Sequence, residues 1–146
     1  MKILYTAEAL ATGEGRDGRA ASTDGMLDVT LAAPVELGGD GGGTNPEQLF
    51  AAGYAACFHS ALRTVARRAR ADASGSTVRA EVDFGTNGSG GYGIGVRMHV
   101  NLPALDQKTA ESLTAAAHQV CPYSNATRGN IPMDLLTTGA RSEVGA

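Results

Sequence analysis

The stretch "NPEQLFAAGYAACF", residues 45–58, decides the fold that we expect for this chain. Asn45 is a favourable N-cap, Pro46 suits the first helical position, and Gln48 gives the spacing of a capping box. Apolar or small residues then recur along one helix face, at positions 49, 50, 53, 54, 57, 61 and 65. The pattern predicts a long helix from residue 46 to the arginines near residue 70, buried over its first half.

Three strand patterns precede this helix. They are "KILYTAEA" (2–9), "GRAAST" (18–23) and "MLDVTLA" (26–32). Asp24-Gly25 lies between the last two and predicts a hairpin turn, because this dipeptide readily adopts positive φ angles. The glycine-rich segment "LGGDGGGT" (37–44) predicts a flexible loop before the helix.

Two strands, a helix and a final strand are expected after it. "STVRAEVDFGT" (76–86) and "YGIGVRMHVNL" (92–102) predict the two strands. Asp106 is placed to cap a second helix, which should end near Cys121 because Pro122 follows. "IPMDLLTT" (131–138) predicts the last short strand. This order predicts an α+β fold in a single domain, residues 1–146.

Composition narrows the class of protein. With 146 residues, 42% of them hydrophobic, the chain can bury an ordinary globular core. A net charge of −3 gives no electrostatic reason to expect nucleic acid or an anionic membrane as partner. The N-terminal apolar run is too short for a secretory signal, and no segment has the length of a membrane span. We therefore expect a cytoplasmic protein.

The two cysteines, Cys57 and Cys121, are either inert core thiols or a redox-active pair, since structural disulfides are uncommon in a reducing cytosol. Cys57 lies among alanines in mid-helix, where a cysteine often serves as a small core residue. To react at neutral pH its thiolate needs a nearby cation, and arginine is the natural candidate. Cys121 is expected at a helix C-terminus, whose dipole disfavours a thiolate and suits a resolving thiol.

Other kinds of site fit less well. The glycine loop lacks the Lys-Ser/Thr ending of a phosphate-binding loop, and Glu47 would repel a phosphate. The histidines and cysteines fit no zinc-ligand spacing, so we expect no metal and no cofactor. The basic residues at the end of the long helix complement its dipole, with nucleic-acid binding as a second choice. They are Arg63, Arg67, Arg68 and Arg70.

Three segments closely resemble the organic hydroperoxide resistance (Ohr) branch of the Ohr/OsmC superfamily, with matching order and spacing over essentially the whole chain. They are "GRDGRAASTDGMLDVTLAAPVELGG" (15–39), "GTNPEQLFAAGYAACF" (43–58) and "CPYSNATRGNIP" (121–132). The resemblance implies an intertwined homodimer with antiparallel sheets packed around a long central helix. It also implies a thiol-dependent peroxidase that reduces organic (alkyl and fatty-acid) hydroperoxides to alcohols, with a lipoylated protein or dihydrolipoamide as reductant.

The resemblance further implies residue roles. Cys57 takes the position of the peroxidatic cysteine and Cys121 that of the resolving one, while Arg19 matches the activating arginine and Glu47 the glutamate that orients it. The aromatic residues near Cys57 could line a pocket for organic peroxides or could simply be core. They are Phe50, Tyr54 and Phe58. Two alternatives remain: an OsmC-like peroxidase of broader range, and a non-enzymatic stress or binding protein with core cysteines.

The spacing of Glu47 and Cys57 sets a geometric condition on any shared site. Ten residues of α-helix advance about 15 Å and leave the two side chains roughly 80° apart around the axis. On one straight helix the two cannot flank the same guanidinium group. Either the helix breaks between them or Glu47 reaches the site from a second copy of the chain.

Overall fold

The long helix predicted from residue 46 is present and continuous. The computed structural model describes residues 1–140 and falls into two units, Met1–Leu49 and a second that begins at Phe50. Helix α1 (Pro46–Ala69) begins in the first unit and continues through the second without interruption. At its start, the Asn45 side chain accepts a hydrogen bond from the Gln48 amide at 2.9 Å, as the N-cap pattern predicts.

The first unit holds a three-stranded antiparallel sheet in the order β1-β2-β3. Its strands are β1 (Ala9–Thr12), β2 (Arg19–Ser22) and β3 (Asp28–Thr30), and two short 3-10 turns, Gly15–Asp17 and Val35–Leu37, accompany them. The predicted hairpin joins β2 to β3, and Gly25 adopts the positive φ of 74° that the tight turn needs.

The expected first strand over residues 2–9 is wrong. Strand β1 begins only at Ala9, because Ala9–Thr12 is the stretch that faces β2 in register. Ile3, Leu4 and Tyr5 have strand-forming side chains, but they are between 70% and 88% exposed and belong to no strand. Propensity without a neighbouring strand to pair with does not make a strand.

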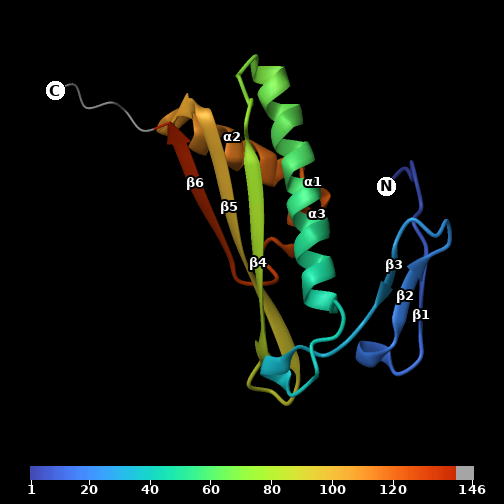
Figure 1. Ribbon diagram of the computed structural model, residues 1–146. Helices are drawn as coiled ribbons and strands as arrows, with labels where there is room; N and C mark the ends of the chain where they lie inside the picture. Colours follow the sequence, from blue (N-terminus) through green and yellow to red (C-terminus); the bar gives the residue numbers. More distant parts are fainter. Residues whose placement is uncertain (141–146) are drawn as a thin grey trace. The chain divides into compact units, whose positions relative to one another are not determined.

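The second unit packs α1 and α2 (Gln107–Val120) on one face of a three-stranded sheet, as Figure 1 shows. The sheet runs in the order β4-β5-β6, with β4 (Thr77–Thr86), β5 (Tyr92–Asp106) and β6 (Met133–Ala140). Alternate residues of β5 point into the core, where they meet the buried face of α1. They are Val96, Met98, Val100 and Leu102.

This second sheet corrects the expectation of purely antiparallel sheets. Strands β4 and β5 pair antiparallel, but β6 runs parallel to β5. The chain between them crosses through α2 and a short helix, α3 (Pro122–Thr127), which the sequence pattern did not predict. Such a crossover returns the chain to the end of the sheet at which β5 began, and this is the connection that parallel pairing requires.

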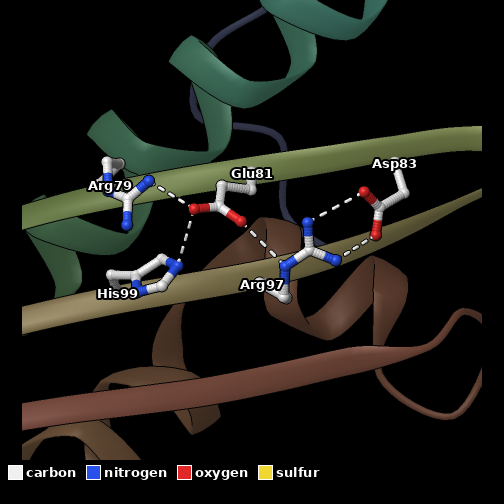
Figure 2. A network of polar contacts seen from close by, with 5 residues as sticks. All are labelled: Arg79, Glu81, Asp83, Arg97 and His99. Atoms are coloured by element: carbon white, nitrogen blue, oxygen red, sulfur yellow. Dashed lines mark hydrogen bonds and ion pairs between the residues drawn. The ribbon is translucent and has the colours of Figure 1, made fainter.

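The opposite face of this sheet carries a charged network, shown in Figure 2. Glu81 lies at its centre, accepting hydrogen bonds from Arg97 at 2.8 Å and from Arg79, with His99 at 3.0 Å. Arg97 also binds Asp83 through both terminal nitrogens. The hydrogen bond from Arg97 holds the pKa of Glu81 below its ordinary value. The network joins β4 to β5 across the polar face.

Candidate active site

Cys57 and Cys121 lie side by side although 64 positions separate them in the sequence. Their sulfur atoms are 3.6 Å apart, and both cysteines are free thiols. Cys57 is partly exposed on α1, whereas Cys121 is fully buried at the junction of α2 and α3. A disulfide needs the sulfurs about 2 Å apart, so a small side-chain movement would close the bond.

Contacts between the side chains of α3 and α1 accompany this proximity. A Cβ atom at Gly53 would lie 3.0 Å from the Tyr123 hydroxyl oxygen, so the glycine leaves room for the Tyr123 ring. That ring contacts Phe50 and Tyr54, with centroid separations of 6.0 and 5.5 Å. Position 53 has no side chain, so the Tyr123 ring can lie against α1 there.

Buried hydroxyl groups fix α3 in this position. The Tyr54 hydroxyl is within 2.9 Å of Ser124 Oγ and 3.0 Å of Thr127 Oγ1, and all three side chains are buried. Pro122 stops α2 and starts α3, while the Cys121 amide still donates to Ala117 at 2.9 Å. Cys121 is therefore held by hydrogen bonds on both sides.

The surroundings of Cys57 oppose its ionisation. Burial raises the pKa of the Cys57 thiol, and the hydrogen bond with Cys121 raises it further. A hydrogen bond from the Tyr123 backbone amide favours the thiolate but does not reverse the balance. A reactive thiolate at this position requires an added cation, as the sequence analysis anticipated.

The ion pairs of the first unit differ from the expected pairing of Arg19 with Glu47. Glu47 binds Arg16 instead, through two hydrogen bonds of 2.6 and 2.9 Å. Arg19 binds Asp28 through two bonds of 2.5 and 2.7 Å across the β2–β3 pair. These hydrogen bonds keep the pKa of both carboxyl groups low.

Burial distinguishes the two pairs. The Glu47 side chain is only 15% exposed, against 47% for Asp28. Sequence reasoning missed Arg16, although "GRDGR" offers two arginines three positions apart. In the β2–β3 pairing, Asp28 lies opposite Ala21 and diagonally from Arg19. This register brings Asp28 within reach of Arg19, and it is the signal that Arg19 pairs with Asp28 and not with Glu47.

The three aromatic residues predicted near Cys57 separate into two groups. Tyr54 and Phe58 are fully buried, which favours a role in the core over the lining of a peroxide pocket. Phe50 is partly exposed and lines an apolar pocket of about 470 Å³ together with Pro122, Tyr123, Ala126 and Thr127. Cys57 lines a different pocket of about 460 Å³.

Two kinds of feature are absent from the described part of the chain. Among residues 1–140, no group of three or more His, Cys, Asp or Glu side chains is placed to hold a metal ion. Within the same residues, none of the helices combines the length and apolar content that crossing a membrane requires.

Comparison with known proteins now gives the family. Residues 39–136 match the family model described as OsmC-like protein. The chain is 53% identical to an organic hydroperoxide resistance protein of Xanthomonas axonopodis pv. citri, covering 92% of this chain and 94% of that one. It is 46% identical to the organic hydroperoxide resistance protein OhrB of Bacillus subtilis, over 90% of this chain and 96% of the relative.

A solved structure agrees with these sequence relatives. The organic hydroperoxide resistance protein of Legionella pneumophila superposes with a TM-score of 0.90 at 50% identity, covering 94% of this chain and 99% of that one. The chain belongs to the OsmC-like family, among the organic hydroperoxide resistance proteins.

Proposed function

We propose that this protein is a thiol-dependent peroxidase that reduces organic hydroperoxides to alcohols. The observation that carries the proposal is the 3.6 Å separation between the sulfurs of Cys57 and Cys121. The names of the relatives, organic hydroperoxide resistance proteins, support a role in peroxide detoxification. Paired free thiols also suit a reducing compartment such as the cytoplasm.

The proposed reaction begins at Cys57, the more accessible of the two thiols. Its thiolate attacks the O–O bond, and the alkoxide leaves, takes up a proton and becomes the alcohol. The oxygen that stays on sulfur makes Cys57 a sulfenic acid. The Cys121 thiol then displaces that oxygen as water and forms the Cys57–Cys121 disulfide. By family resemblance, a dihydrolipoyl dithiol reduces the disulfide and is itself oxidised.

Substitution of each cysteine separates these roles. Cys57→Ser should abolish consumption of cumene hydroperoxide, because the nucleophile is lost. Cys121→Ser should react once and then accumulate sulfenic or sulfinic acid at Cys57, seen by intact mass. The reverse pattern, with a folded Cys121→Ser variant that never reacts, would exchange the two assignments. A wild-type protein that consumes no peroxide and keeps both thiols intact would leave the cysteines as core residues, the alternative of a non-enzymatic protein.

The cation that activates Cys57 is proposed to be Arg16 rather than Arg19. Glu47 shares two hydrogen bonds with Arg16 and is largely buried, so it can orient that guanidinium group. Arg19 is already committed to Asp28 on the exposed edge of its hairpin. A guanidinium group would favour the thiolate and would stabilise the departing alkoxide.

A matched pair of variants tests this assignment through the pH dependence of Cys57 alkylation. A nearby cation lowers the pKa of a thiol, so removal of the cation must raise the pKa of Cys57. Arg16→Gln should move the alkylation midpoint upward by about one pH unit or more. Arg19→Gln removes the same charge and should leave the midpoint unchanged. A shift confined to Arg19→Gln would restore the original assignment of Arg19.

A homodimer with shared sites is the remaining part of the proposal. Helix α1 is unbroken between Glu47 and Cys57, so a break in the helix does not bring the two side chains to one site. With about 15 Å of axial separation on one helix, Glu47 is better placed to serve the Cys57 of a second copy. We therefore propose an intertwined homodimer in which the Arg16–Glu47 pair and the cysteine pair of each site come from different subunits.

Mixed dimers test the shared site. Cys57→Ser and Glu47→Ala variants, each impaired alone, are refolded together so that heterodimers form. One site of each heterodimer then lacks both substitutions, and peroxidase activity should return to about half that of the wild type per heterodimer. If mass spectrometry confirms heterodimers and activity does not return, each chain uses its own Glu47.

A further inference from the structure

One arginine side chain joins α2 to α3 on either side of Cys121. Arg128 directly follows α3, and its Nη1 atom donates a hydrogen bond to the His118 carbonyl oxygen, in the last turn of α2, at 2.9 Å. Its Nη2 atom donates to the Asn125 side chain on α3. The Arg128 backbone amide also donates to the Ser124 carbonyl oxygen at 2.8 Å. Cys121 therefore lies in a corner that one guanidinium group closes.

Pro122 explains why the His118 carbonyl group needs this donor. In a continuous α-helix the amide of residue 122 would donate to the carbonyl oxygen of residue 118, as the Cys121 amide does to Ala117 at 2.9 Å. Pro122 has no N–H, so this donor is missing. Arg128 replaces it with a charged donor, which also complements the negative end of the α2 dipole.

The corner matters because the sulfur atoms must approach each other to form the disulfide. They lie 3.6 Å apart, and a disulfide bond is about 2 Å long. The Cys121 sulfur attacks the sulfur of the Cys57 sulfenic acid, so an S–S bond forms and the S–O bond breaks. The departing hydroxide takes the thiol proton and leaves as water. No further oxidant enters this step, and its rate depends on how well the two sulfurs are held together.

Two sets of hydrogen bonds hold α3 from different sides. The Tyr54 hydroxyl group joins α3 to α1, which carries Cys57. Arg128 joins α3 to α2. If the second set is lost, α3 stays attached to α1 but the end of α2 is no longer fixed to it. Cys121, between α2 and α3, then gains freedom to move away from Cys57.

We propose that Arg128 is a positioning residue that holds Cys121 for attack on the Cys57 sulfenic acid. The inference rests on the proposed peroxidase function and adds a residue to its second step. Arg128 acts through the backbone of α2 and α3, so the first step, attack of Cys57 on the peroxide, does not depend on it. What depends on Arg128 is whether the sulfenic acid meets Cys121 before a second peroxide molecule.

Single-turnover kinetics without a reductant separates the two steps. Arg128→Gln should leave the rate of Cys57 oxidation unchanged and slow disulfide formation about three- to tenfold, a modest factor because Arg128 is exposed and water replaces part of the lost hydrogen bonding. With excess tert-butyl hydroperoxide, more Cys57 should become sulfinic acid, seen as a mass increase of about 32 Da. Arg128→Lys should be slowed only about twofold, because an ammonium group can still donate to the carbonyl but lacks the fork that reaches both partners.

Two controls separate positioning from general damage. Arg79→Gln removes an equal charge from the opposite face of the sheet (Figure 2) and should change neither step. Arg128→Gln combined with Cys121→Ser should oxidise at the rate of Cys121→Ser alone. Slower oxidation of the double variant would overturn the proposal, because the damage would then include Cys57. Disulfide formation at the wild-type rate in Arg128→Gln would overturn it as well, and so would a wild-type rate in Arg128→Lys if Arg128→Gln did not fold.

A measurement without peroxide distinguishes this inference from the proposed function. Equilibration with glutathione buffers of graded composition gives the effective concentration of the two thiols toward each other. Arg128→Gln should lower this effective concentration about three- to tenfold, which would support the positioning role even if the protein consumed no peroxide. Equal values for the wild-type protein and Arg128→Gln would refute that role, even with peroxidase activity intact.

Discussion

The close contact between Gly53 and the Tyr123 ring is the constraint on which the cysteine pair depends. A Cβ atom at position 53 would lie 3.0 Å from the Tyr123 hydroxyl oxygen, so the tyrosine ring would have to shift by a few tenths of an ångström. The Tyr54 hydroxyl, bonded to Ser124 and to Thr127, holds the same helix from inside the core. A buried hydroxyl group without a hydrogen bond costs free energy. The arrangement of α1 and α3 in which all three hydroxyl groups are hydrogen-bonded is therefore favoured over others. That arrangement places Cys121 beside Cys57.

This arrangement also creates a chemical problem. Partial burial protects a sulfenic acid from water and gives an organic peroxide apolar contacts, but it raises the pKa of the Cys57 thiol. The proposed mechanism needs an arginine to reverse that effect. A guanidinium group is itself costly to desolvate, and a carboxylate such as Glu47 offsets the cost while fixing its orientation. In the proposed mechanism, the burial of Cys57, its thiolate and the Arg16–Glu47 ion pair therefore depend on one another.

Local sequence signals predicted a large part of this fold. The Asn45 cap, the Asp24-Gly25 turn and the Asp106 cap each depend on a few neighbouring residues, and all three are present. Features that depend on distant partners were not predictable in the same way. The parallel pairing of β6 with β5 joins strands that α2 and α3 separate in the chain. Glu47 pairs with Arg16, and Arg19 pairs with another carboxylate. These pairs depend on how the folded chain positions the side chains, and the spacing of residues in the sequence does not predict that.

The central claim is that Cys57 and Cys121 form one redox-active pair. The most direct measurement treats the reduced wild-type protein with one equivalent of tert-butyl hydroperoxide, then counts free thiols and records the intact mass. We predict that both thiols disappear, the chain mass falls by about 2 Da, and a peptide linking Cys57 to Cys121 is recovered. Two intact thiols with the peroxide unconsumed would contradict the account.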